Sequence, residues 1–155
     1  MAAVYIGLGT NLGDKKKNIT NATILLGSVM GEIKNLSSLY ETEPWGFESD
    51  NSFLNAVVLL ETTHSPKVCL EMAKAIEREM GRTYTKSGYE DRIIDVDILM
   101  YDSEVVEEEN LIIPHALLHK RDFVLKPMAE LAPDLCHPVL GKSMEELLSD
   151  LKKND

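Results

Sequence analysis

The sequence has little cysteine and no long apolar run. Cys69 and Cys136 are the two cysteines among 155 residues, too few for a disulfide framework and typical of a chain whose thiols stay reduced. No run of 18 apolar residues occurs, so we expect no transmembrane helix. The first residues lack the basic segment with which a signal peptide begins. We therefore expect a cytoplasmic protein.

Positive charge is also scarce. The 16 Lys and Arg residues oppose 26 Asp and Glu residues, which gives a net charge of −10. This sign argues against general binding to nucleic acid or to anionic membranes, but not against a small anionic ligand. An apolar fraction of 44% excludes wholesale disorder. The length predicts one domain, residues 1–155, that buries about two-thirds of its unfolded surface.

Several motifs of nucleotide-binding and hydrolytic enzymes are absent. Residues 7–13 resemble a dinucleotide fingerprint, but Leu12 stands where the third glycine belongs. Neither the G-x-x-x-x-G-K-[ST] phosphate loop nor the G-x-S-x-G nucleophile motif occurs. Neither cysteine has a convincing catalytic partner, and Cys69 fits the apolar stripe of a helix. The sequence therefore gives no sign of a covalent nucleophile.

The most informative segment is a predicted strand, residues 92–101, that carries two aspartates. Residues two apart in a strand share a face, so Asp95 and Asp97 project together while their apolar neighbours face a core. At a separation of about 6 Å two carboxylates repel by roughly 3 kcal/mol at an effective dielectric near 20. Mg²⁺ removes that cost and is commonly held by carboxylates and substrate phosphates. The alternative is an edge strand with two solvated aspartates.

Periodicity and turn signals predict an α+β fold with a mostly antiparallel sheet. Ser65-Pro66 begins a helix that Gly81 ends, and Ser143-x-x-Glu146 is a capping box for the last helix. A hairpin joins the second and third strands. The other predicted elements are strands at 3–9, 33–41, 52–62 and 111–113, and helices at 15–30 and 123–131.

Two polar segments, 44–51 and 81–91, join these elements. The second contains no aliphatic residue and so cannot bury itself. Both are either ordinary surface loops or lids over a site. Arg82 and Arg92 flank the second loop, where guanidinium groups suit bidentate clamping of phosphate oxygens.

A basic cluster follows Pro114. It admits three interpretations: a solvated face, a surface that binds an anion, or a metal site built on His115 and His119. The metal site lacks a third ligand of the right type nearby. The members of the cluster are His115, His119, Lys120, Arg121 and Lys126.

Phe53 and Asn55 share a face of the third predicted strand. An aromatic plane beside an amide suits a flat heterocycle with donor and acceptor edges. The alternative is structural, with Phe53 packed under a loop and Asn55 capping a turn.

Over essentially its full length the chain resembles the 6-hydroxymethyl-7,8-dihydropterin pyrophosphokinases of folate biosynthesis. The combination of R-x-x-D-V-D-I at 92–98 with Pro114-His115 is the most specific part. Other matching segments are Y-I-G-L-G-T-N-L-G at 5–13, Y-E-T-E-P-W-G at 40–46, F-L-N-A at 53–56, I-E-R-E-M-G-R at 76–82 and R-x-F at 121–123.

The resemblance implies a ferredoxin-like fold and transfer of pyrophosphate from the co-substrate ATP to the pterin hydroxymethyl group, with release of AMP. It implies a monomer with small-molecule partners only. Asp95 and Asp97 would hold two Mg²⁺ ions, and the catalytic residues would be Arg82, Arg92, Asp95 and Asp97. The ATP-binding residues would be Glu77, Arg82, Arg92, Ile98, His115 and Arg121, and those that bind the pterin would be Thr42, Pro44, Trp45, Phe53, Asn55, Tyr89 and Phe123.

The chain departs from the commonest family pattern at four positions. Tyr84 and Tyr89 stand where Arg and Trp are frequent, Ala116 replaces a Tyr, and Glu43 replaces a Pro. Two other classes stay open: a different Mg²⁺-dependent phosphoryl or nucleotidyl transferase, and a ligand-binding domain without catalysis. The nucleotide product distinguishes the first class, because this family releases AMP whereas a kinase releases ADP. Mg²⁺-dependent nucleotide binding distinguishes the family from the second class.

Overall fold

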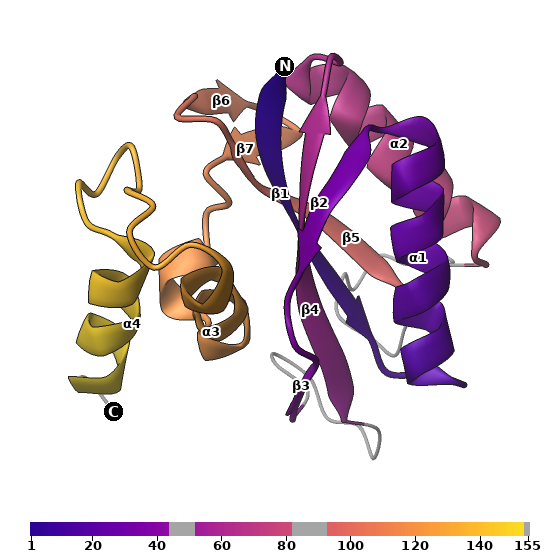
Figure 1. Cartoon of the computed structure of the whole chain (residues 1–155), viewed down its shortest axis with the longest axis horizontal. Helices are drawn as coiled ribbons and strands as arrows, with labels where there is room; N and C mark the ends of the chain where they lie inside the picture. Colours follow the sequence, from indigo (N-terminus) through magenta and orange to yellow (C-terminus); the bar gives the residue numbers. More distant parts are fainter. Residues whose placement is uncertain (44–51, 82–92, 154–155) are drawn as a thin grey trace.

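The computed structural model describes residues 1–43, 52–81 and 93–153 (Figure 1). The helices are α1 (Lys15–Val29), α2 (Pro66–Glu79), α3 (Asp122–Leu131) and α4 (Met144–Lys153), with a short 3-10 turn at Leu118–Lys120. The strands are β1 (Ala2–Thr10), β2 (Glu32–Leu36), β3 (Tyr40–Thr42), β4 (Phe53–Thr62), β5 (Asp95–Tyr101), β6 (Val106–Glu108) and β7 (Leu111–Ile113).

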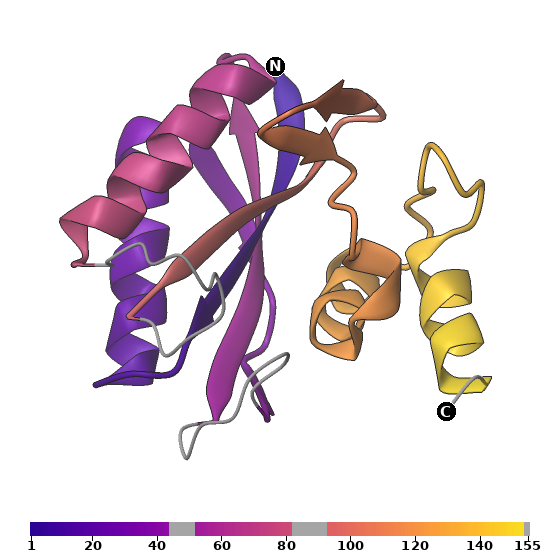
Figure 2. The same ribbon diagram turned by 180° about the vertical axis from the view of Figure 1, so that it is seen from behind.

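The main sheet has the strand order β2-β4-β1-β5. Strand β3 pairs with β4 along the same edge as β2, nearer the start of β4. Every pairing among these strands is antiparallel. The two views show α1 and α2 against one face of this sheet and α3 and α4 on the other side (Figures 1 and 2). This arrangement confirms the predicted ferredoxin-like α+β fold.

Local sequence signals set the helix ends as predicted. Ser65 accepts a hydrogen bond from the backbone of Val68 in the first turn of α2. At α4, Ser143 Oγ accepts from the Glu146 N–H at 3.1 Å, while Glu146 accepts from the Ser143 N–H at 3.0 Å. These reciprocal bonds satisfy amide groups that a helix start leaves unpaired.

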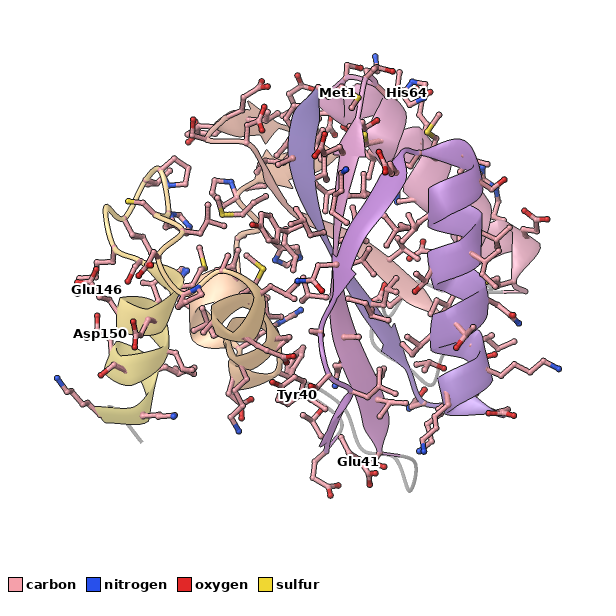
Figure 3. The ribbon with its side chains drawn as sticks, viewed as in Figure 1. Met1, Tyr40, Glu41, His64, Glu146 and Asp150 are labelled. Atoms are coloured by element: carbon pink, nitrogen blue, oxygen red, sulfur yellow. The ribbon has the colours of Figure 1, made fainter. Side chains whose placement is uncertain are left out.

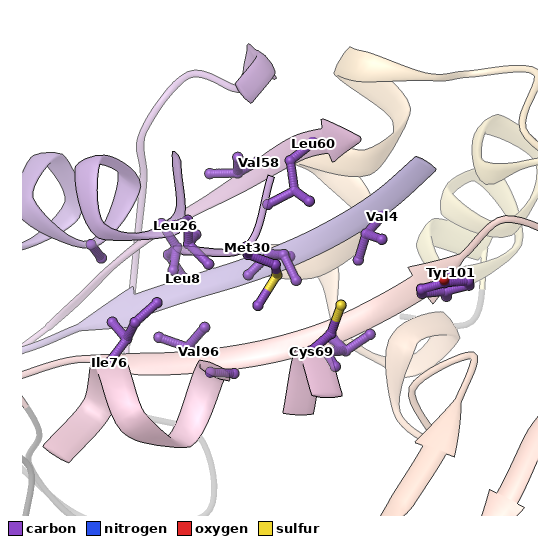
Figure 4. Close-up of a cluster of buried hydrophobic side chains, with 14 of the residues drawn as sticks. Val4, Leu8, Leu26, Met30, Val58, Leu60, Cys69, Ile76, Val96 and Tyr101 are labelled. Carbon is purple, nitrogen blue, oxygen red and sulfur yellow. The ribbon is translucent and has the colours of Figure 1, made fainter. Parts of the chain in front are cut away.

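The first face of the sheet packs against α1 and α2. Alternate residues of three neighbouring strands, among them Leu8, Val58 and Val96, meet apolar side chains of the two helices (Figure 4). Cys69 is fully buried in this cluster, as predicted for a small core residue. The strand period of two therefore leaves the opposite set of side chains for the second face.

The second face is apolar over one half and polar over the other. Its apolar half, with Tyr5 and Val57, packs against Leu125 and Met128 of α3 and Leu147 of α4. Beyond this cluster the same strands carry glycine, asparagine and aspartate. Because α3 covers only part of the face, the polar half remains accessible.

One predicted strand is wrong in its extent. Residues 33–41 form two strands, β2 and β3, and both pair with β4. Between them Ser37 Oγ accepts from the Val57 N–H at 2.9 Å, so a side chain replaces a backbone partner in the ladder. The strand at 111–113 is confirmed, and its partner β6 was not anticipated.

None of the helices in the described part of the chain combines the length and the apolarity needed to cross a bilayer.

Candidate active site

An open cavity lies over the polar half of the second face, beside the start of α3. It encloses about 700 Å³, including the solvent at its mouth. Strands β1, β3, β4 and β5 and helix α3 all contribute to its wall. The lining residues are Gly7, Leu8, Gly9, Thr42, Glu43, Phe53, Asn55, Ala56, Val57, Asp95, Asp97, Leu99, His115, Arg121, Phe123 and Val124.

Two glycines of the central strand form the floor of this cavity. Gly9 pairs with Asn55 of β4 on one side and with Asp95 of β5 on the other. Gly7 pairs in the same way with Val57 and Asp97. Residues directly opposite in neighbouring strands share a face, so a side chain at position 9 would stand between the Asn55 amide and Asp95. Gly9 keeps that space open, whereas the Leu99 side chain lies over Gly7, 3.3 Å from where a Cβ atom would be.

Asp95 and Asp97 project from the same face of β5, as predicted, and both are half-buried. Ile94, Val96 and Ile98 are buried in the core on the other face. No cluster of three or more His, Cys, Asp or Glu residues suited to a metal occurs within residues 1–43, 52–81 and 93–153. Two carboxylates beside an open cavity suit Mg²⁺, which keeps waters and takes ligands from substrate phosphates.

Glu77 lies behind the aspartate strand rather than in the cavity. It is 3% exposed, and its Oε2 accepts a hydrogen bond from the Val96 N–H at 2.8 Å. This amide lies between the two aspartates in sequence, on a strand at the edge of the sheet. Glu77 therefore fixes the backbone that carries Asp95 and Asp97.

His115 and Arg121 supply the positive side of the cavity. The His115 N–H donates to Leu99 O at 2.9 Å, which ties this residue to β5. Its Nδ1 accepts from the Leu117 N–H at 3.1 Å, so Nε2 carries the proton of the neutral ring. Burial and the Arg121 charge lower the pKa of His115, while Asp95 opposes the shift. A neutral His115 ring that can donate from Nε2 thus lies beside the permanently charged Arg121.

The rest of the predicted basic cluster lies elsewhere. His119 packs edge-on against His137, with ring centroids 6.3 Å apart. Lys126 pairs with Asp122 at 3.5 Å, and Lys120 is exposed. The metal interpretation of His115 and His119 has no support, because each of these rings has a separate environment and His115 precedes the 3-10 turn rather than lying on a helix.

Phe53, Asn55 and Thr42 form the wall opposite α3. Asn55 is 6% exposed, and its Nδ2 donates to Thr42 Oγ1 at 2.8 Å and to Tyr40 O at 3.4 Å. These bonds orient Asn55 Oδ1 toward Gly9, where a Cβ atom would lie 3.2 Å away. The amide therefore presents an acceptor to the cavity.

Phe123 faces this wall from the start of α3. The guanidinium carbon of Arg121 lies 5.4 Å from the centre of its ring. Arg121, Phe123 and Val124 all line the cavity, so the amino-terminal end of α3, which carries partial positive charge, is directed at it.

Several predicted site residues lie apart from the cavity or outside the described residues. The side chain of Ile98 is buried in the core, so only its backbone is left to contact a ligand. Arg82, Arg92, Pro44, Trp45 and Tyr89 lie outside the described residues, as do both predicted lids apart from Gly81. Ala116 is exposed, and Glu43 lines the cavity.

The role of the glycines in the cavity floor was not predicted from the sequence. Gly7 and Gly9 were noted within a failed dinucleotide fingerprint and within a segment that matches the family pattern. Their spacing of two within a strand was the available signal, because it places both on the face opposite Ile6 and Leu8. Which residues flank them became apparent only from the register of β1 with β4 and β5.

Comparison with known proteins identifies the family. The sequence profile of the 7,8-dihydro-6-hydroxymethylpterin-pyrophosphokinases (HPPK) matches residues 5–133. The chain belongs to the HPPK family. It is therefore an enzyme, a pyrophosphokinase of folate biosynthesis.

Curated relatives of the HPPK family match almost end to end. The chain is 46% identical over 141 residues to the 2-amino-4-hydroxy-6-hydroxymethyldihydropteridine pyrophosphokinase of Porphyromonas gingivalis, a match that covers 89% of this chain and 95% of that protein. The enzyme of the same name from Aquifex aeolicus is 40% identical over 146 residues, 94% of this chain and 90% of that one.

Solved structures show the same HPPK fold. The crystal structure of wild-type Plasmodium falciparum HPPK-DHPS superposes with a TM-score of 0.77 over 96% of this chain, at 18% identity. The chain spans 44% of the length of that longer protein. At this identity the likeness concerns the fold alone.

Proposed function

We propose that this protein transfers the β,γ-pyrophosphoryl group of ATP to the hydroxymethyl group of 6-hydroxymethyl-7,8-dihydropterin. The hydroxymethyl oxygen forms a bond to the β-phosphorus and loses its proton. The bond between that phosphorus and the oxygen bridging it to the α-phosphorus breaks, and this oxygen leaves on AMP. The products are AMP and the pterin diphosphate.

One observation carries the proposal. A single cavity has two aspartates at one side, an aromatic and an amide at the other, and Gly9 between Asp95 and Asn55. The first side suits a metal-bound triphosphate and the second a flat heterocycle. Because Gly9 places no side chain between Asp95 and Asn55, the two substrates would meet over it.

On the nucleotide side, Asp95 and Asp97 would hold two Mg²⁺ ions, which when bound neutralise phosphate charge. Arg121 would pair with phosphate oxygens, and His115 would donate a hydrogen bond from Nε2. Glu77 would act by holding β5, and Ile98 would offer its backbone to the adenine. Arg82 and Arg92 complete the ATP site that we propose from the family resemblance.

On the pterin side, Phe53 and Phe123 lie on opposite walls and would stack on the two faces of the ring. Asn55 Oδ1 would accept from a ring or amino N–H, because its amino group is bonded to Thr42. Thr42, Pro44, Trp45 and Tyr89 complete the pterin site that we propose from the resemblance.

The reaction requires no protein nucleophile. Aligning the hydroxymethyl oxygen with the β-phosphorus and stabilising the charge on the phosphate oxygens provide the acceleration. We propose that the enzyme acts as a single-domain monomer. Because both of its cysteines are free thiols, we place it in the reducing cytoplasm.

Two methylene analogues of ATP test which bond breaks. With the β,γ-methylene analogue and the pterin we expect AMP, since the bond between the α- and β-phosphates stays cleavable. With the α,β-methylene analogue we expect no reaction. Transfer of the γ-phosphoryl group alone would give the opposite pattern, and chromatography of the nucleotide products distinguishes the two.

A further inference from the structure

The carboxylate of Glu130 gathers hydrogen-bond donors from the segment between β2 and β3. Tyr40 Oη donates to it at 2.6 Å and Ser38 Oγ at 3.0 Å. The Ser38 N–H lies 3.0 and 3.1 Å from its two oxygens. Figure 3 shows Tyr40 beside α3. One carboxylate thus connects the end of α3 to β3, about 90 residues away in sequence.

The charge states favour these bonds at neutral pH. The hydrogen bond to Glu130 raises the pKa of Tyr40 to about 12. Loss of solvent around the carboxylate acts to raise the pKa of Glu130, an otherwise exposed residue, but the bonds from Tyr40 and Ser38 outweigh it and the pKa is lowered. A neutral phenol and a charged carboxylate form the stronger, charge-assisted type of hydrogen bond.

The same segment is fixed to the sheet by Ser37. The Ser37 N–H donates to Val57 O at 2.9 Å, and the Val57 N–H donates to Ser37 Oγ at 2.9 Å. Ser37 and Val57 are 5% and 1% exposed, so water does not compete for these bonds. Ser37 therefore connects the segment to β4, and Glu130 connects α3 to the segment.

These contacts lie next to the two walls of the cavity. Glu130 and Phe123 are seven residues apart, which is two helical turns or about 10.5 Å along the same side of α3. Tyr40 and Thr42 are two residues apart and share a side of β3. The contact between Glu130 and Tyr40 thus lies beside the pair of walls that carry Phe123 and Thr42.

We infer that Glu130, Tyr40 and Ser38 form a positioning clamp for the heterocycle site. Apolar packing of Leu125 and Met128 holds α3 on the sheet, but such contacts are non-directional. Hydrogen bonds depend on angle and distance, so the clamp fixes how α3 is turned and how far Phe123 stands from Thr42. That the heterocycle is a pterin rests on the proposed function.

The binding test uses Tyr40→Phe and Glu130→Gln in the full chain. Calorimetry measures affinity for 6-hydroxymethylpterin and, separately, for Mg²⁺ with the α,β-methylene analogue of ATP. We expect both variants to bind the pterin about three- to tenfold more weakly and the analogue within about twofold of wild type. Asp150→Asn is the control, because it removes the carboxylate charge from an equally short 2.6 Å bond, which Lys142 donates, remote from the cavity.

A second measurement does not depend on the ligand. In the free protein we expect amide hydrogen exchange to accelerate together in segments 38–42 and 122–131 of Glu130→Gln and to stay unchanged in the control. Failure of wild type to bind the pterin would refute the proposed function, while exchange would still test the clamp. Unaltered pterin affinity, a parallel loss of both ligands, or unaltered exchange would overturn the clamp.

Discussion

Gly9 and Asn55 are direct cross-strand partners on the floor of the cavity, and a methyl group on Gly9 would lie 3.2 Å from Asn55 Oδ1. This distance is tighter than ordinary van der Waals contact, so either the amide or the strand must yield. The orientation of the one acceptor that the amide presents to the cavity thus depends on the absence of a side chain in the neighbouring strand.

Gly9→Ala should therefore weaken pterin binding by at least about tenfold, because it displaces the Asn55 amide or fills the space beneath the ring. Calorimetry with pterin gives the result. Gly13→Ala is not a suitable control, since Gly13 has a φ of +69°. Gly27→Ala is the matched change, because Gly27 lies in α1, on the opposite face of the sheet from the cavity, and its Cβ would lie 3.2 Å from Ile33. It should leave pterin affinity unaltered.

Asp95→Asn and Asp97→Asn should each lower turnover by several orders of magnitude, because an amide of the same shape lacks the charge that attracts Mg²⁺. Neither change should unfold the protein, since relief of the repulsion between the carboxylates offsets lost contacts. Steady-state rates across a Mg²⁺ titration provide the test. Asp134→Asn, at an exposed position, is the control. Near-normal turnover of an Asp97 variant at limiting Mg²⁺ would contradict the assignment.

Glu77→Ala should destabilise the fold by roughly 1–3 kcal/mol, because it leaves the Val96 N–H without its acceptor at a buried position. Turnover should also fall, since the aspartates lose their fixed backbone. Denaturant unfolding and steady-state rates measure the two effects. A stable variant with unaltered turnover would show that Glu77 does not hold the strand.

Asn55→Ala should reduce pterin affinity by roughly 1–3 kcal/mol and leave ATP affinity nearly unaltered. Because Asn55 Nδ2 also bonds Thr42 Oγ1, the melting temperature should fall as well. Thr42→Val removes that bond but keeps the acceptor of Asn55. It therefore separates the effect of how the amide is oriented from that of its hydrogen bond to the pterin. A lowered melting temperature with intact pterin affinity would favour a structural role for Asn55.

His137 should make stability dependent on pH. Its Nδ1 accepts from the N–H groups of Val139 and Leu140, and burial together with His119 lowers the pKa of His137. Below about pH 6.5 the unfolded chain binds a proton at this histidine that the folded chain does not. The contribution of His137 to the free energy of unfolding is therefore fully present above about pH 6.5 and is lost as the pH drops toward the folded pKa.

Thermal melts of wild type and His137→Asn test this dependence, since the Asn side-chain oxygen still accepts but does not titrate. We expect the melting temperature to fall between about pH 7 and pH 5, and to fall less in the variant. His115, whose pKa is lowered as well, is retained in both proteins and contributes equally. Identical pH profiles would contradict the assignment to His137.

Features that depend on local periodicity were predicted from the sequence. The alternation in β4 and β5 placed Asn55 with Phe53, and Asp95 with Asp97, on the correct faces because a strand has a period of two. The caps at Ser65 and Ser143 followed from residue type and spacing.

Features that depend on tertiary contacts were not predicted. Ser37 ends β2 by bonding a strand 20 residues away, which the β-rich pattern of 33–41 does not reveal. The basic residues after Pro114 are close in sequence, yet a turn and the start of α3 direct them to different surfaces. The place of Gly7 and Gly9 in the cavity floor became apparent only once their neighbours across the sheet were known.

The central claim is transfer of an intact pyrophosphoryl group, and phosphorus NMR of the complete reaction tests it most directly. The enzyme is incubated with Mg²⁺, ATP and 6-hydroxymethyl-7,8-dihydropterin, with Asp97→Asn as the inactive control. We predict one resonance of AMP and two coupled resonances of a diphosphate ester on the pterin. Resonances of ADP with a single uncoupled phosphate ester, or no pterin-dependent consumption of ATP, would contradict the account.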